Sequence, residues 1–204
     1  MKYLQDLYFT NLNVVYNMGG FFSIKEGNDW SCGEHVFEQC KFYFITEGEC
    51  VIYIKGKRYD AKAGDWFFIP AGTAHSYYNI KDKPFKKYWM HFDLYPDVKI
   101  AEFLSLPIFV RHNRAALKAF DALVKAAKSD ELSDKLAVKG YIYTLLVEYV
   151  KLANPDGVSV QSRADERLDK VLRYINENLA EGYGTPEEFE RAKRHKAPES
   201  ATGA

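Results

Sequence analysis

Apolar side chains between residues 35 and 92 come in short runs that alternate with polar positions. These runs are rich in aromatic and β-branched residues, and Gly, Pro or charged residues separate them. Short runs with turn residues at close intervals are typical of an antiparallel meander that closes as a sandwich or barrel. The predicted strand-forming blocks are 35–37, 41–45, 50–54, 58–60, 64–79 and 85–92.

After Pro96 the hydrophobic period changes to that of a helix. Apolar residues recur every three or four positions over 113–128 and again over 133–152. Ser133 is a candidate N-cap for the second helix, and Asn154 to Gly157 form a stop signal. Two amphipathic helices joined by a short turn predict a helical hairpin. Its apolar faces either pack fully on the barrel or leave a stripe that serves as a dimer surface.

The two ends of the chain have less regular patterns. Residues 1–29 are predicted to be a lead-in with short strands, in which Gly19-Gly20 is a turn signal. They form either an edge strand with its turn or an aromatic arm over the barrel mouth. Residues 154–166 are polar and predict a linker, and 167–180 predict one more amphipathic helix. Residues 185–204 are expected to be a frayed turn of helix followed by disorder.

Composition limits the class of protein. The chain has 204 residues, 47% of them hydrophobic, which is enough for a sizeable core. With 28 basic and 28 acidic residues, the whole chain offers no electrostatic footprint for nucleic acid or for an anionic membrane. The three cysteines fit no C-x-x-C spacing, so they indicate reduced, apolar residues rather than a disulfide or zinc site. No apolar run resembles a signal peptide or spans a bilayer, so we expect a soluble, cytoplasmic protein without a membrane partner.

The stretch 64–79, GDWFFIPAGTAHSYYN, carries the most specific motif. Gly64, Pro70, Gly72, His75 and Asn79 stand at every specified position of the second cupin motif, G-x5-P-x-G-x2-H-x3-N, which this stretch resembles. The resemblance implies a cupin-type antiparallel β-barrel, or jelly roll, with His75 pointing inward. The predicted fold class is therefore mostly β with C-terminal helices: a cupin-type barrel, a two-helix hairpin and a trailing helix.

Metal-binding cupins have three histidines and one glutamate as ligands, and the resemblance assigns those slots here. Counted back from Gly48, the first motif places its histidines at 35 and 37 and its glutamate at 41. This sequence keeps His35 and, in the second motif, His75, but has Phe37 and Lys41 at the other two slots. Two imidazoles beside an ammonium make a poor site for a divalent metal. We therefore predict no metal, no cofactor and no catalytic residue.

The barrel pocket that remains predicts a binding site. Strand alternation from Lys41 and His75 places Tyr43 and Tyr77 on the same inward face. Imidazole, hydroxyl and ammonium groups among aromatic walls suit a small polyhydroxylated or anionic ligand, although each residue could equally be ordinary core. Alternation alone does not decide whether Trp66 or Trp89 also faces inward. The predicted ligand-binding residues are His35, Lys41, Tyr43, His75, Tyr77 and Trp89.

A second resemblance concerns the chain beyond the barrel. The run YWMHF at 88–92 is similar to the "YWxHF" stretch of sensor domains in AraC-type transcription regulators, and 168–179 resembles the first helix of their DNA-binding domain. The resemblance implies an effector-binding barrel over 1–100, a helical dimerisation hairpin over 101–153 and a linker over 154–166. Residues 167–204 would then be the truncated start of a helix-turn-helix domain plus a disordered tail.

Three functions follow as hypotheses. The first is the effector-binding and dimerisation domain of an AraC-type regulator. Its partners would be a small carbohydrate effector, a second copy bound through the hairpin and, only if the helix-turn-helix domain is present, DNA. The second is a small cupin isomerase, epimerase or dioxygenase, with His75 and either Tyr43 or His35 as acid and base. The third is an interaction module that dimerises and binds no small molecule.

Overall fold

The computed structural model describes residues 9–25, 30–95 and 106–154. Of these, all but Phe9 and Thr10 belong to one compact unit, Asn11–Val160. Within the described residues, no helix has the length and apolarity needed to cross a membrane.

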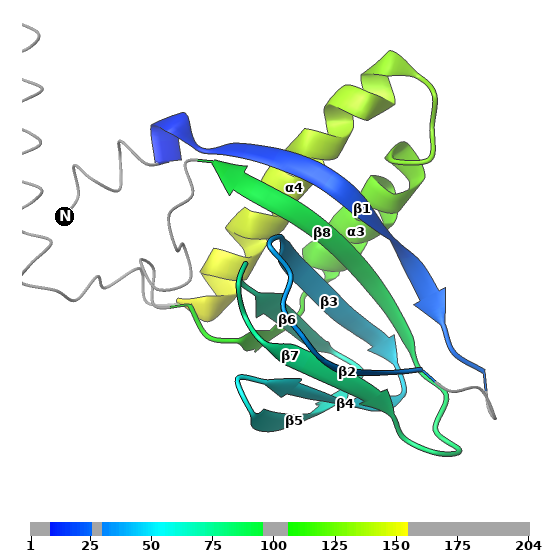
Figure 1. Cartoon of the computed structure of the whole chain (residues 1–204). Helices are drawn as coiled ribbons and strands as arrows, with labels where there is room; N and C mark the ends of the chain where they lie inside the picture. Colours follow the sequence, from blue (N-terminus) through cyan, green and yellow to red (C-terminus); the bar gives the residue numbers. More distant parts are fainter. Residues whose placement is uncertain (1–8, 26–29, 96–105, 155–204) are drawn as a thin grey trace, which may run out of the picture. The chain divides into compact units, whose positions relative to one another are not determined.

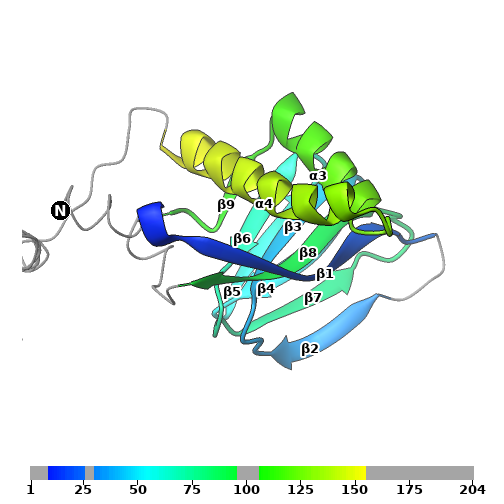
Figure 2. The ribbon, with the colours of Figure 1, turned by 90° about the horizontal axis from the view of Figure 1, so that it is seen from above.

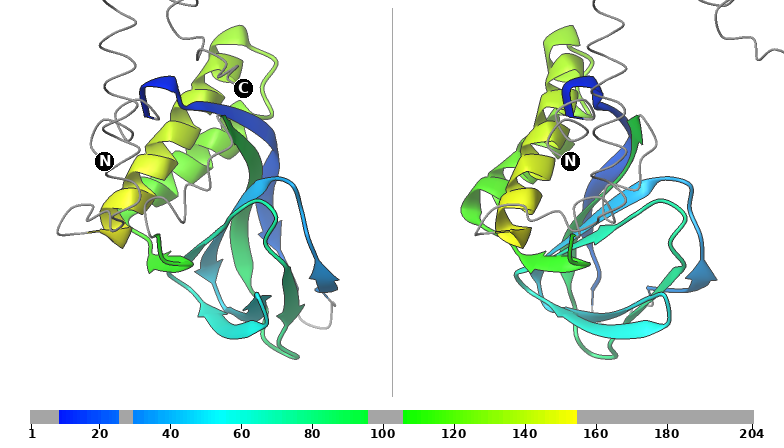
Figure 3. Two further views of the ribbon diagram at one scale, coloured as in Figure 1. Left: turned by 60° about the vertical axis from the view of Figure 1, so that its left-hand side comes forward. Right: turned by 90° about the vertical axis from the view of Figure 1, so that its left-hand side faces the viewer.

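Two antiparallel sheets face each other in this unit (Figures 1 and 3). The five-stranded sheet has the order β1-β8-β3-β6-β9 and the four-stranded sheet the order β2-β7-β4-β5. Successive strands alternate between the two sheets, with orders 1-8-3-6 and 2-7-4-5. This is the strand order of a jelly roll, so the predicted fold class is confirmed. The strands are β1 Asn13–Ser23, β2 Ser31–His35, β3 Cys40–Glu47, β4 Glu49–Ile54, β5 Lys57–Lys62, β6 Asp65–Ile69, β7 His75–Asn79, β8 Lys86–Tyr95 and β9 Phe109–Arg111.

Two helices, α3 Arg114–Ala126 and α4 Leu132–Ala153, cover the outer face of the five-stranded sheet (Figure 2). Phe42 of β3 joins the layers, because its ring lies 5.5 Å from that of Tyr149 in α4 and 6.2 Å from that of Phe120 in α3. The periodicity after residue 113 therefore placed both helices correctly, and α4 ends at the predicted stop.

The predicted N-cap of α4 is wrong. The helix begins at Leu132, so Ser133 already lies in its first turn, and Glu131 occupies the cap position without a capping side-chain bond. The side chain of Ser129 instead accepts a hydrogen bond from the Glu131 amide. By contrast, Asn113 caps α3, since its side chain accepts a hydrogen bond from the Ala116 amide at 2.8 Å.

Strand alternation divides the side chains of the five-stranded sheet between two cores. Phe42 and Phe44 of β3 point to the helices, whereas Tyr43 and Ile45 belong to the core between the sheets. Trp66 is fully buried on the helix side, with its ring 5.7 Å from that of Phe120. Trp66 is therefore part of the core between the sheet and the helices. The barrel interior is lined by the alternate residues of each strand, which point toward the four-stranded sheet.

The segment before the first cupin motif differs from the prediction. The glycine pair does not form a turn but lies inside an 11-residue strand, β1, where Gly19 pairs with Met90 and Gly20 with Trp89 of β8. A Cβ on Gly19 would lie 2.7 Å from the Trp89 carbonyl oxygen. Close approach of two strands, rather than chain reversal, is what this glycine permits.

The region between the barrel and the helices also differs in one respect. Phe109–Arg111, within the segment assigned to the helical hairpin, forms β9 and pairs with β6 at the edge of the five-stranded sheet. Three residues are too few for period 2 to be recognised in a sequence. The predicted linker beyond Asn154, the helix over 167–180 and the tail lie outside the described residues.

Candidate ligand site inside the barrel

Two strand pairings bring the polar residues of the interior together. In the five-stranded sheet β3 lies beside β8, so that Lys41 pairs with His91 and Tyr43 with Trp89. In the four-stranded sheet β2 lies beside β7, and His35 pairs with His75. The rings of His35 and His75 are 4.1 Å apart between centroids.

A buried amine–imidazole pair connects the two sheets. The Nδ1–H of His75 donates to the Thr73 carbonyl at 2.8 Å, which leaves Nε2 as an acceptor. Nε2 lies 2.9 Å from Nζ of Lys41, so the Lys41 ammonium donates to it. Burial lowers the pKa of His75 to about 4 and that of Lys41 to about 8, so the imidazole is neutral at neutral pH.

His35 has a free ring nitrogen. Its Nδ1 lies 2.8 Å from the Gly33 carbonyl oxygen and donates to it, so Nε2 carries a lone pair. That Nε2 is buried and has no hydrogen-bond partner among the described residues. Buried polar atoms are normally paired, so an unpaired acceptor beside the Lys41–His75 pair is a candidate contact for a ligand.

Aromatic rings form the walls next to these groups. Tyr77 stacks on Trp30 at 4.0 Å between ring centroids and lies 6.2 Å from Tyr43. Tyr43 is buried, and burial raises the pKa of its hydroxyl. Trp89 packs against the interior core and places its ring 5.4 Å from that of His91. The structure thus places all six predicted residues on the strand faces that point into the barrel.

Two charged or titratable side chains were missed, and both lie on β8. Lys87 and His91 flank Trp89 at alternate positions and share its face. The Nζ of Lys87 lies 3.8 Å from the ring centroid of Tyr43 and 3.9 Å from that of Trp30. Alternation from Trp89 would have found both residues, but the sequence did not show which way Trp89 points.

The sequence comparisons agree with this architecture. Residues 19–146, more than half of the chain, match the family model of the AraC-like ligand binding domain. The chain belongs to this family.

One curated relative of this AraC-like domain is the raffinose operon transcriptional regulatory protein RafR of Pediococcus pentosaceus. The two are 22% identical over an alignment of 161 residues, and the match covers 74% of this chain and 57% of the relative. The chain therefore spans a little over half the length of that regulator.

The similar solved structures have TM-scores below 0.5. ToxT of Vibrio cholerae, solved with a bound unsaturated fatty acid, is 8% identical, with a TM-score of 0.46 and coverage of 72% of this chain and 60% of ToxT. A Cupin 2 conserved barrel domain protein of Salinispora arenicola is 24% identical, with a TM-score of 0.33 over 41% of this chain and 76% of that one. A predicted oxalate decarboxylase of Thermotoga maritima is 22% identical, with a TM-score of 0.32 over 39% and 78%.

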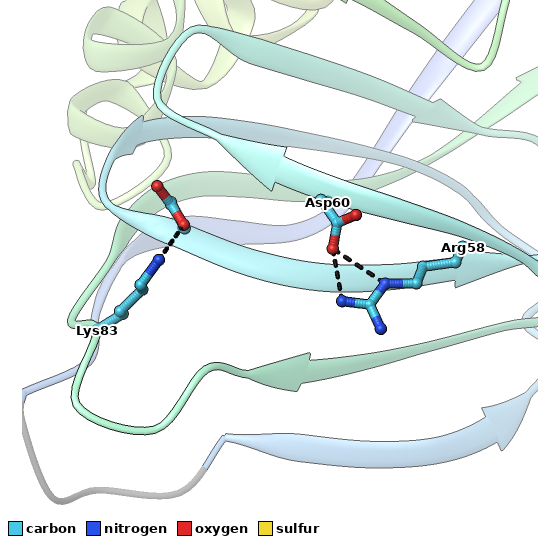
Figure 4. Close-up of polar contacts among 4 residues, drawn as sticks. Arg58, Asp60 and Lys83 are labelled. Atoms are coloured by element: carbon cyan, nitrogen blue, oxygen red, sulfur yellow. Dashed lines mark hydrogen bonds and ion pairs between the residues drawn. The ribbon is translucent and has the colours of Figure 1, made fainter.

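The charges of this AraC-like domain are distributed unequally between surface and interior. On the outside of the four-stranded sheet, Arg58 pairs with Asp60 at 2.7 Å and Lys83 with Glu49 at 2.6 Å (Figure 4). Such exposed pairs add little to stability, because water and salt screen the two charges. Inside the barrel, Lys41 and Lys87 are only 1% and 4% exposed, and no carboxylate of the described residues pairs with either.

The interior does not fit a divalent metal. No group of three His, Cys, Asp or Glu side chains in the described ranges is arranged to hold a metal ion. The lone pair of His75 that a metal would need already accepts the Lys41 hydrogen bond. Phe37 fills its slot with a ring whose centroid lies 3.2 Å from Nζ of Lys41, so the position suits a cation–π contact rather than coordination.

Proposed function

We propose that this domain senses a carbohydrate, a sugar or sugar derivative, in the interior of its barrel and does not act as an enzyme. The observation that carries this proposal is the buried, unpaired Nε2 of His35 next to the Lys41–His75 pair. Sugar hydroxyl groups donate and accept at once, so one hydroxyl can donate to His35 while another accepts from Lys41.

The aromatic side chains around these polar groups also support a carbohydrate ligand. Trp89 and Tyr77 offer ring faces, and the ring of Tyr77 lies 5.5 Å from that of His35. A pocket with apolar walls and a few convergent polar groups is the usual design of a small-molecule site. The name of the relative, a regulator of a raffinose operon, supports a carbohydrate.

We further propose that the domain forms a homodimer through the helical hairpin. Leu132, Leu136 and Val147 lie along the outer face of α4 and are 72%, 68% and 50% exposed. A helix that is apolar on the face opposite the core usually has a partner there. Gly140 belongs to the same face, and a Cβ built on it would meet no atom of the described residues within 4 Å beyond its own stretch of helix, so none of them requires a glycine here.

In the complete regulator, ligand binding would bias how these dimers present the DNA-binding segment. We assign residues 167–204 to the start of that segment and place the protein in the cytoplasm. A ligand shifts such an equilibrium only by as much as its affinity differs between the two states. Effector binding to the barrel and dimer geometry at α4 are therefore the two quantities to measure.

The ligand part can be tested by titrating sugars while following tryptophan fluorescence and thermal unfolding. Raffinose, melibiose, galactose and glucose, each up to millimolar concentration, form the first panel. We expect at least one to raise Tm, and a Tyr77→Ala variant to bind it roughly tenfold more weakly, with Tyr53→Ala on the same sheet as control. The sugar should be recovered unchanged. Chemical conversion of the sugar would instead favour an enzyme, and no response to any carbohydrate would contradict the proposal.

The dimer part can be tested by sedimentation velocity at micromolar concentration. Leu136→Glu should convert dimers to monomers, because it places a carboxylate in an apolar contact. Val36→Glu is the matched control, since Val36 is also exposed but lies in the loop after β2, away from α4. A monomeric wild-type protein, or a dimer unaffected by Leu136→Glu, would argue against this interface.

A further inference from the structure

We infer that the effector carries an anionic group, a carboxylate or a phosphate, and that Lys87 and Lys41 bind this group inside the barrel. The inference rests on the proposed function, since it assigns a charge to the same ligand. It makes Lys87 of β8 a specificity-determining residue: sugar acids or sugar phosphates bind more tightly than the neutral sugars from which they derive.

The first argument is the isolation of the Lys87 ammonium. Lys87 is only 4% exposed, and its Nζ contacts the ring faces of Trp30 and Tyr43, with Phe22 and Tyr77 farther away at 5.9 and 5.4 Å. No carboxylate among the described residues forms an ion pair with it. Ring faces compensate only part of the lost hydration of an ammonium, so a buried lysine of this kind lacks a counter-ion.

The second argument is the charge balance of the interior. Lys41, His35, His75 and His91 face the same space from β2, β3, β7 and β8, and none of them is acidic. Asp65 is the one buried carboxylate of the described residues, and it is already bound by Arg111 at 2.9 Å and by the Lys62 amide. The interior thus has two amines and no carboxylate available to neutralise them.

These amines repel each other. Burial lowers the pKa of Lys87 to about 7, and the positive charge of Lys41 acts in the same direction. An anion placed between the two ammonium groups would reverse this effect and hold both amines protonated. Charge-assisted hydrogen bonds of this kind are stronger than neutral ones, and they form only with a ligand that brings the negative charge.

The rest of the site indicates what the anionic group is attached to. His35 and the tyrosine hydroxyls are hydrogen-bonding groups for a polyhydroxylated body, and Trp89 is a flat surface. A lipid chain would leave the buried Nε2 of His35 without a partner. Sugar acids and sugar phosphates satisfy both the amines and the imidazole.

The test uses ligands that differ only in charge. Calorimetric titration of the full chain would compare galactose with galacturonate and galactose 6-phosphate, glucose with gluconate and glucose 6-phosphate, and inorganic phosphate alone. We expect an anionic member to bind roughly 10- to 100-fold more tightly than its neutral parent. Lys87→Met should remove that difference. Lys86→Met should preserve it, because the Lys86 side chain is 41% exposed and pairs with Glu47 on the surface.

A separate measurement guards against misfolding. Lys87→Met keeps the length of the side chain and removes a buried charge, so Tm of the ligand-free variant should be equal to or higher than that of the wild type. A fall in Tm would show that the ammonium is a structural cation–π partner and would overturn the inference.

The outcomes separate the inference from the proposed function. Equal binding of neutral and anionic sugars, unchanged by Lys87→Met, overturns the inference and leaves the sugar sensor intact. Binding of inorganic phosphate as tight as that of every sugar phosphate supports the anion site and contradicts the carbohydrate assignment. A panel without any binding contradicts both.

Discussion

At the scale of single residues, the interior of this barrel has a lysine where the metal-binding cupin motif has a glutamate. Lys41 stands in the glutamate slot of the cupin motif, and His75 accepts its hydrogen bond at 2.9 Å. The same substitution that removes a carboxylate from the metal site adds the first of two buried ammonium groups. Lys87 is the second, and the two together change a cation site into a candidate anion site.

The buried amines predict an unusual pH dependence of stability. The folded pKa of Lys87 is about 7, against 10.5 for a free lysine, so above pH 7 the unfolded chain binds more protons than the folded chain. The free energy of unfolding therefore rises with pH from 7 toward 9, by about 1–2 kcal/mol from this group. Above about pH 9 the raised pKa values of Tyr43 and Cys50 act in the opposite direction.

Urea unfolding at pH 7, 8 and 9 would measure this slope in the ligand-free protein. Lys87→Met should flatten it markedly, and the part that persists should come from Lys41, whose pKa is about 8. Lys86→Met should keep the wild-type slope. Parallel curves for the wild type and Lys87→Met would mean that Lys87 stays charged when buried.

At the scale of elements, β1 depends on a close strand contact that only glycine allows. Gly19→Ala would put a Cβ 2.7 Å from the Trp89 carbonyl oxygen and 2.9 Å from Cβ of Met90. We expect a loss of about 1–3 kcal/mol, measured by chemical unfolding. Gly20→Ala is the matched control, because its nearest neighbour is Nε1 of Trp89 at 3.6 Å, an ordinary contact. Equal costs for the two variants would show that the strands can separate without penalty.

The helix caps give a second prediction at this scale. Asn113 caps α3 and also donates to Glu148 of α4 at 2.7 Å, so Asn113→Ala should cost about 1–2 kcal/mol. Ser133→Ala should change stability by less than about 0.5 kcal/mol, because Ser133 lies inside α4 and caps nothing. The reverse order of the two costs would restore Ser133 as the cap.

At the scale of the whole molecule, α4 connects the barrel to the proposed dimer. Gly140 is exposed in the middle of this helix, where glycine costs about 1 kcal/mol relative to alanine. Gly140→Leu should therefore stabilise the monomer and weaken the dimer, because a leucine would block close approach of a second helix. Chemical unfolding and sedimentation velocity together check the two opposite signs. If Gly140→Leu leaves the dimer as strong as in the wild type, Gly140 does not lie in its contact.

The sequence by itself determined the fold class, the two helices and six of the residues that face the barrel interior. Fixed spacing of Gly64, Pro70, Gly72, His75 and Asn79 identified the barrel, and slot counting found Lys41 and His35. These inferences succeed because turn glycines, period 2 and period 3.6 are local properties of the chain. Once one inward residue of a strand is known, counting by two identifies the others on the same face, as it did from Lys41 to Tyr43.

Only the tertiary structure decided what depends on contacts between distant segments. Gly19 and Gly20 looked like a turn until β8 lay beside them, and β9 exists because β6 offers an edge. The same holds for β8. Its period of 2 shows that successive side chains alternate between two faces, but not which face points into the barrel. Pairing with β3 decided this and turned Lys87 and His91 inward. A buried lysine without a counter-ion can be recognised only once every element around it is in place.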